Sequence, residues 1–185
     1  EDNPMSAEKV ELGRFLFYDP RLSGNGTQAC AGCHDQALAF TDGRAQAIGS
    51  TGELHPRSAQ HLSNVVYNAT LTWANPSLVT LERQMETPLF GENPVEMGIN
   101  DSNKAAVLKR LADDSTYPAR FAASFPGDPA PVSWGNTIKA ISAFQRTLIS
   151  GGSKYDRYLQ GKELLGAAEE RGMNLFFGEK AECFH

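Results

Sequence analysis

Residues 30–34 read Cys30-Ala31-Gly32-Cys33-His34, and this short stretch decides how the rest of the chain is interpreted. Two cysteines three positions apart, followed directly by histidine, form the attachment signature of a c-type haem. On one helical turn the two thiols can form thioethers with the two vinyl groups of one porphyrin, and His34 can then place an imidazole nitrogen on the iron. The motif therefore predicts covalently bound haem c and a redox chemistry that side chains alone do not supply.

Two other chemistries use a pair of cysteines at this spacing. One is half of a zinc site, but no second pair lies at the distance typical of zinc ribbons. The other is a thioredoxin-type dithiol, but no strand–helix–strand pattern surrounds the motif. Haem attachment is the interpretation that the sequence favours.

Length and composition set wider limits. The chain has 185 residues, of which 41% are hydrophobic and 21% charged, as in soluble globular proteins with one good-sized domain or two small ones. No run of 18 apolar residues is present, so no membrane span is expected. The net charge of −5 argues against nucleic acid as a partner. The first four residues carry no basic and apolar leader, so any signal peptide is expected to have been removed.

Helical periodicity dominates the chain and alternating strand patterns are nearly absent, so the predicted fold class is all-α. Ser6 is expected to cap a first helix that ends at Asp19-Pro20. Its inward face is expected to carry Val10, Leu12, Phe15 and Leu16. Further helices are expected at 76–86 (with Pro76 at the start), 102–113, 117–125, 133–148 (capped by Ser133), 154–159 and 166–177. Segments 20–28, 41–58 and 88–98 are too rich in Gly and Pro to be regular.

The surroundings of the haem motif carry a more specific pattern. It consists of residues 12–23 (LGRFLFYDPRLS) before the motif, then Trp73, residues 81–84 (LERQ) and residues 93–98 (NPVEMG) after it. In this order and spacing they resemble the bacterial di-haem cytochrome c peroxidase and MauG superfamily, over essentially the whole chain. Segments 52–58 and 64–76 are closer to its MauG/MbnH branch than to the classical peroxidases.

The resemblance implies two cytochrome c-like domains, each with its own C-x-x-C-H motif. Residues 1–135 are then the N-terminal peroxidatic haem domain, and 136–185 are helices leading into an incomplete second cytochrome c-like domain. Cys183 looks like the first cysteine of the second motif, with His185 at an x position; the alternative for Cys183 is a free thiol. The chain would be roughly the N-terminal half of a protein that holds a second haem c.

The resemblance also assigns three catalytic side chains. Glu96 would take a proton from the peroxide oxygen nearest the iron and return it to the leaving oxygen; its ordinary alternative is an exposed loop carboxylate. Gln84 would position peroxide or water, unless it faces solvent on its helix. Trp73 would carry electrons between the two haems, unless it is a buried core tryptophan.

Two features depart from the classical peroxidases, which carry a histidine that caps the resting iron. His55 lies in the matching loop but only two residues before Arg57, so we predict that it does not ligate and that the haem is five-coordinate; His55 and His61 are otherwise loop histidines. Calcium often lies between the two domains in this family. Ser58 stands where the classical side-chain ligand stands, and a hydroxyl is the poorer ligand, which leaves backbone carbonyls, water or Asn64 to hold calcium.

The resulting hypothesis is a periplasmic dihaem oxidoreductase that uses hydrogen peroxide to form high-valent haem iron and oxidises a protein partner by long-range electron transfer. A classical cytochrome c peroxidase, which reduces peroxide with electrons from a small redox protein, is the alternative within the family. A non-catalytic electron-transfer cytochrome c is the alternative from another class, and it needs a sixth iron ligand such as Met85, Met97 or His55. A haem-based sensor is the weakest alternative.

Overall fold

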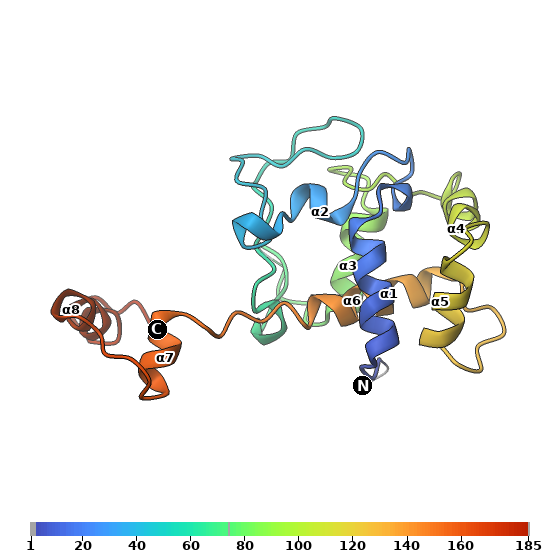
Figure 1. Cartoon of the computed structure of the whole chain (residues 1–185). Coiled ribbons are helices and arrows are strands. Elements are labelled where there is room, and N and C mark those ends of the chain that lie inside the picture. The colour runs from blue at the N-terminus through green and yellow to red at the C-terminus, as the bar shows by residue number, and fades with distance from the viewer. Residues whose placement is uncertain (1–2, 74, 185) are drawn as a thin grey trace. The chain divides into compact units, whose positions relative to one another are not determined.

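A computed structural model describes residues 3–73 and 75–184, which divide into two compact units, Glu1–Ile149 and Ser150–His185 (Figure 1). Within the described ranges the regular structure is helical and β-pairing is limited to isolated bridges, which confirms the all-α prediction. Unit 1 contains α1 (Ala7–Tyr18), η1 (Pro20–Leu22), α2 (Cys30–Cys33), η2 (Gln36–Leu38), η3 (Val65–Tyr67), α3 (Leu81–Phe90), α4 (Lys104–Ala112), α5 (Tyr117–Ser124) and α6 (Trp134–Gln145). Unit 2 contains α7 (Lys154–Leu159) and α8 (Ala167–Phe176).

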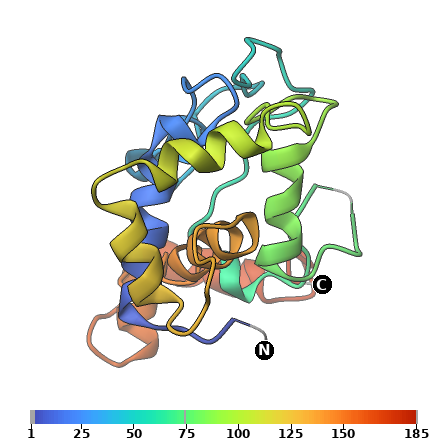
Figure 2. The ribbon, with the colours of Figure 1, turned by 90° about the vertical axis from the view of Figure 1, so that its right-hand side faces the viewer.

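The crossing of α1 and α6 is the centre of unit 1. In Figure 2, α6 lies between α1 and α5 on one side and α3 on the other. Gly13 lets the two backbones touch, because a Cβ there would lie only 1.9 Å from the Ala140 carbonyl oxygen. The contact draws α6 into unit 1, which ends at Ile149. The division into a haem domain of residues 1–135 and the start of a second domain stays a prediction.

The inward face of α1 differs from the expected one at one position. Ser6 caps the helix as predicted, with its hydroxyl accepting from the Lys9 N–H at 3.2 Å. Phe15, however, is 38% exposed, whereas Phe17 is fully buried with Leu12 and Leu16. Since α1 packs on α5 and α2 as well as on α6, the buried stripe is turned toward Phe17 and leaves Phe15 outside.

The helix expected at 76–86 begins and ends later than predicted. Thr80 is its N-cap and accepts from the Arg83 N–H at 3.3 Å, so Pro76 lies outside α3. Pro88 lies inside the last turn, although a proline removes an N–H and usually ends a helix. The turn persists because the chain beyond it supplies other partners.

Those partners come from the segment 91–99. The N–H groups of Met97 and Ile99 donate to the carbonyls of Pro88 and Leu89 at 3.0 and 3.3 Å. Backbone groups that a proline-containing helix end would leave unpaired are satisfied in this way. The pairing also holds residues 91–98, predicted to be irregular, along the end of α3.

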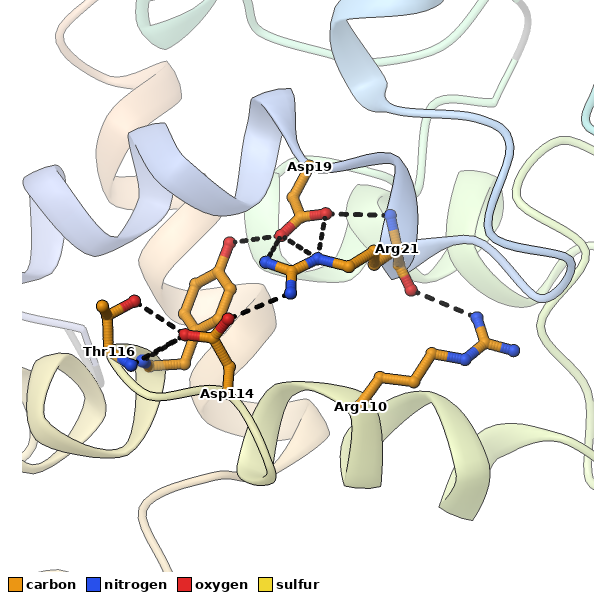
Figure 3. A network of polar contacts seen from close by, with 6 residues as sticks. Asp19, Arg21, Arg110, Asp114 and Thr116 are labelled. Atoms are coloured by element: carbon orange, nitrogen blue, oxygen red, sulfur yellow. Dashed lines mark hydrogen bonds and ion pairs between the residues drawn. The ribbon is translucent and has the colours of Figure 1, made fainter.

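A polar network fixes the chain just before α2 (Figure 3). The Arg21 guanidinium pairs with Asp19 at 2.7 Å and with Asp114 at 3.0 Å, and the Tyr117 hydroxyl donates to Asp19 at 2.8 Å. Arg110 donates to the backbone carbonyls of residues 21, 23 and 24. Burial raises the pKa of Asp19, but the hydrogen bonds from Arg21 and Tyr117 outweigh it and the net pKa is lowered. Segments far apart in sequence therefore hold the loop that leads into residues 30–34.

Unit 2 is built on aromatic contacts. Tyr155 packs on Tyr158 and on Phe177 with ring centroids 6.3 Å apart in both pairs. Ser153 caps α7 in a reciprocal arrangement with Asp156, and α7 and α8 lie at the residues expected for them. In the part of the chain that the structure describes, no helix has the length and apolar character needed to cross a membrane.

Candidate active site

A single cavity of about 650 Å³ in unit 1 brings together six of the residues singled out from the sequence. These are Cys30, Cys33, His34, Trp73, Gln84 and Glu96. They come from α2, from the loop before α3, from α3 and from the segment 91–98, which are separate in sequence. A cavity of this volume is in the range that proteins use for cofactors and other small molecules.

The two cysteines lie on one helical turn in the cavity wall. The His34 N–H donates to the Cys30 carbonyl at 3.0 Å, which places the histidine directly after that turn. Burial raises the pKa of Cys30 to about 12 and also raises the pKa of Cys33. Both are free thiols, and Gln28, which the sequence reasoning did not identify, donates to the Cys33 sulfur at 3.2 Å. Two neutral thiols in one cavity wall fit covalent attachment of a haem.

His34 is held in the orientation that an axial ligand needs. Its Nδ1 donates to the Phe40 carbonyl at 2.8 Å, which is the kind of orienting bond that an iron-ligating imidazole makes through its other ring nitrogen. Ala39 and Phe40 both have positive φ angles, of 56° and 62°, and this turn brings the Phe40 carbonyl back to the imidazole. Burial lowers the pKa of His34, which favours the neutral form that binds metals. The partner of this orienting bond cannot be read from the motif.

Glu96 and Gln84 lie in the same cavity wall, each half-buried. Burial raises the pKa of Glu96, and attraction by His55 opposes that rise. The alternative of a freely exposed carboxylate is therefore wrong, and so is that of a solvent-facing Gln84. The structure brings both side chains to the cavity but leaves their predicted roles untested.

One further polar group faces the cavity wall. Gln145 on α6 is only 4% exposed, lines the cavity, and its Oε1 atom has no hydrogen-bond partner. Buried polar atoms are rarely left unpaired, and an orphan in a cavity wall indicates that a bound molecule or water completes it. The thiol pair, the oriented imidazole and this unpaired oxygen together fit a cavity that binds a prosthetic group. The inward spacing along the α6 sequence was the only available signal for Gln145.

Trp73 is not a core residue. Its side chain is 55% exposed at the rim of the cavity, which excludes the buried-core alternative. The indole Nε1 donates to the Ser58 carbonyl at 3.4 Å, and the Arg57 guanidinium carbon lies 5.4 Å from the ring centroid. One loop therefore holds the indole by its edge and by its face.

The two loop histidines both line the cavity, and His61 is exposed, as expected of a surface loop histidine. His55 is half-buried, and its Nε2 donates to the Val95 carbonyl at 3.3 Å. Asn64 lies outside the cavity, in a left-handed conformation, with its backbone N–H donating to the Leu148 carbonyl at 2.7 Å. No cluster of three or more His, Cys, Asp or Glu side chains suited to a metal occurs among the residues that the structure describes. Calcium binding near Asn64 stays a prediction.

Cys183 belongs to unit 2, where it is exposed and its sulfur contacts the Ala181 carbonyl at 3.5 Å. Its assignment to a second haem motif stays a prediction. The place given to His185 in that motif lies outside the described residues.

The chain is similar in sequence to a known protein family and to several of its members. Residues 7–164 match the family described as di-haem cytochrome c peroxidase. The chain is 35% identical over 182 residues to the methylamine utilization protein MauG of Methylorubrum extorquens, covering 98% of this chain and 49% of that protein. It is 33% identical over 183 residues to the cytochrome c peroxidase Ccp of Escherichia coli, covering 98% of this chain and 38% of that protein. The chain thus spans about half or less of the length of these curated relatives.

The chain is also similar to solved structures of MauG-like and diheme peroxidase proteins. A MauG-like protein associated with microbial copper homeostasis superimposes with a TM-score of 0.98 at 58% identity, covering 100% of this chain and 53% of that one. The diheme peroxidase BthA of Burkholderia thailandensis superimposes with a TM-score of 0.73 at 26% identity, covering 94% of this chain and 47% of that one.

Proposed function

Because this chain belongs to the di-haem cytochrome c peroxidase family, we propose that it forms the peroxide-reactive half of a c-type haem oxidoreductase. The observation that carries the proposal is the convergence of residues 30–34 and Glu96 on one cavity. Cys30 and Cys33 would attach the haem, and His34 would bind its iron through Nε2. A bound haem supplies an iron centre that exchanges electrons with peroxide, which side chains cannot do.

The chain's own residues would transfer the proton between the two oxygens of peroxide. Cleavage of the O–O bond requires that the oxygen nearest the iron lose a proton and that the other oxygen gain one, so that it leaves as water. Glu96 as carboxylate can accept that proton and deliver it. The raised pKa of Glu96 supports the role, because a group that both takes and gives a proton works best with a pKa closer to neutral. Gln84 would hold peroxide or water by hydrogen bonds without titrating.

The finer proposal is that the oxidising equivalents leave through Trp73 to a protein partner. Two observations support it: the 0.98 TM-score with a MauG-like protein and the exposure of 55% of the indole at the cavity rim. A large π-system with one open face can pass electrons between the haem cavity and whatever covers that face. A classical peroxidase fed by a small redox protein would use the same cavity. A second haem c, with Cys183 among its attachment residues, belongs to this proposal, as does export to the periplasm, where haem is attached to c-type cytochromes.

The test uses the haem-loaded protein in its ferric form. Hydrogen peroxide is added and the Soret band is followed by stopped flow, for the unmodified protein and for Glu96→Gln. General acid–base catalysis typically contributes about 10²–10⁴-fold, so Glu96→Gln should slow the reaction by that order. Glu92→Gln is the matched control, because Glu92 lies exposed on the same segment and does not line the cavity.

Two results decide against the proposal. A wholly low-spin ferric spectrum that peroxide does not change would indicate an electron-transfer cytochrome. Buried Met85 and Met97 both line the cavity, so a sixth ligand is at hand in that case. An unchanged rate in Glu96→Gln would remove the carboxylate from the mechanism while leaving the haem assignment intact.

A further inference from the structure

The loop 47–58 has a fixed shape of its own. The Ala47 N–H donates to the Arg57 carbonyl at 3.0 Å, and the His55 N–H donates back to the Ala47 carbonyl at 2.9 Å. Nearer the tip, the Gly49 N–H donates to the Glu53 carbonyl at 3.0 Å, and Ile48 and Leu54 form an antiparallel bridge. These cross-loop bonds make the segment a short hairpin, although its glycines and polar residues indicate only a loop.

The hairpin forms hydrogen bonds with the backbone of Val95 and Glu96. The Ser50 N–H donates to the Glu96 carbonyl at 2.7 Å, and the Val95 N–H donates to the Glu53 carboxylate at 3.3 Å. A third hydrogen bond runs from His55 Nε2 to the Val95 carbonyl at 3.3 Å. The backbones are pressed together here, since a Cβ on Gly49 would lie 1.8 Å from the Val95 carbonyl oxygen.

His55 also acts on the Glu96 side chain. Both residues line the same cavity, and the attraction of His55 lowers the pKa of Glu96 against the effect of burial. One other ionisable group of the same hairpin lies close by, because the Glu53 carboxylate accepts from the Val95 N–H next to Glu96. The Glu96 charge also raises the pKa of Cys30 and of Cys33, but neither thiol can titrate once thioethers have formed. The other ionisable side chains of the cavity wall are those of His34, Arg57 and His61.

We propose that His55 is a positioning residue for Glu96 and not an iron ligand. Its imidazole fixes the Val95–Glu96 peptide by a hydrogen bond and, when protonated, sets a positive charge beside the carboxylate. This inference rests on the proposed function, because it gives His55 a part in the acid–base step assigned to Glu96. It also gives a reason for a histidine in a loop whose spacing to Arg57 does not fit iron capping.

The geometry separates two contributions that two variants can distinguish. His55→Asn keeps an N–H donor for the Val95 carbonyl but removes the charge. His55→Ala removes both. Thr51→Ala is the control, because Thr51 lies exposed at the tip of the same hairpin and outside the cavity wall.

The measurement is the pH profile of cyanide association with the ferric haem, followed by the pH profile of the reaction with peroxide. Hydrogen cyanide must lose its proton to a nearby base before it binds, so it reports on Glu96 whether or not the protein is a peroxidase. His55→Ala should lower the plateau rate by roughly tenfold to a hundredfold, since displacement of a reacting group by about 1 Å can cost that much. His55→Asn should recover most of the plateau rate. In both variants the loss of rate on the acid side should move to higher pH.

Two outcomes overturn the inference, and a third overturns only the proposed function. An acid limb that stays in place in both variants would leave His55 with a structural role only. A low-spin ferric spectrum that becomes high-spin in His55→Ala would make the imidazole an iron ligand. Failure of the unmodified protein to react with peroxide would defeat the proposed function, while the cyanide profiles would still decide the role of His55.

Discussion

The contact between α1 and α6 at Gly13 offers a quantitative test of how this fold supports the cavity proposed to hold haem. In Gly13→Ala the added Cβ would lie 1.9 Å from the Ala140 carbonyl oxygen, 2.5 Å from its carbon and 3.0 Å from the Phe144 Cβ. Two of these three neighbours are backbone atoms, which cannot turn away as a side chain can. The helices would have to separate by roughly 1.5 Å to reach an ordinary van der Waals distance.

Two opposing effects set the magnitude. Alanine is favoured over glycine in a helix interior by about 0.8–1 kcal/mol. Overpacking a tight interior typically costs about 1–3 kcal/mol, and occasionally more. A clash with backbone belongs at or above the upper end of that range, so the net loss should be about 2 kcal/mol. For a chain of this size that corresponds to a thermal midpoint lower by roughly 4–8 °C.

The displacement of α1 in Gly13→Ala should also disturb the site, because Phe17 lies one turn beyond Gly13 on the same helix. The Phe17 ring centroid is 6.4 Å from that of His34 and 6.3 Å from that of Phe40, whose carbonyl orients the imidazole. Displacement of α1 should therefore loosen the support behind His34. Thermal unfolding of the haem-loaded protein, followed at the Soret band, measures both effects on unit 1.

Gly135→Ala is the matched control. Gly135 lies in the first turn of α6, and a Cβ there meets nothing within 4 Å. It should be neutral or slightly stabilising, by up to about 1 kcal/mol. A Gly13→Ala midpoint equal to or above that of Gly135→Ala would refute the close-contact reasoning.

Three further outcomes are expected. Replacing both Cys30 and Cys33 by serine should let acidified solvent extract the haem, whereas Cys183→Ser should leave the haem of residues 30–34 attached; haem retained by the denatured double variant would contradict the assignment. Burial raises the pKa of Glu96, so the rate of the peroxide reaction should fall on the acid side at a pH above the ordinary Glu value of about 4.3, and Glu96→Gln should lack this fall. Hydrogen bonds from Thr116 and Arg21 lower the pKa of Asp114, so its stabilising contribution is complete above the unfolded value of about 3.9 and lost as the pH falls through the folded one. Asp114→Asn should therefore lower the denaturation midpoint at neutral pH, and the difference should shrink below about pH 4; a constant difference would count against the network in Figure 3.

The sequence predicts most helices because their signals are local. Ser6, Ser133 and Ser153 cap α1, α6 and α7 through side-chain oxygens that accept from the first turn, and such caps can be read without tertiary information. The error at α3 has the opposite origin. Its last turn contains Pro88 and persists only because Met97 and Ile99 pair with its carbonyls, which no local pattern indicates.

The same division applies to the site. The C-x-x-C-H motif predicts covalent attachment and one iron ligand within five residues, so the proposed chemistry can be read from the sequence directly. The partners that tune it are backbone carbonyls and distant side chains, such as the Phe40 carbonyl at His34 and Gln28 at Cys33. A carbonyl has no signature in a sequence, since every residue carries one. The sequence also does not show that the His55 and Gln145 side chains line the cavity, because a side chain's direction depends on how its loop or helix packs.

The site thus joins a rigid half and an adjustable half. The side proposed to bind iron rests on α1, whose buried Phe17 lies near His34, and on the hydrogen bond between His34 and the Phe40 carbonyl. The acid–base side rests on two irregular segments that hold each other, 47–58 and 91–98, with hydrogen bonds of 2.7 to 3.3 Å. Axial ligation tolerates little movement, whereas a proton carrier must exchange with its surroundings at each turnover. Loop segments open at a lower free-energy cost than packed helices, so this division gives each task to the part of the fold that suits it.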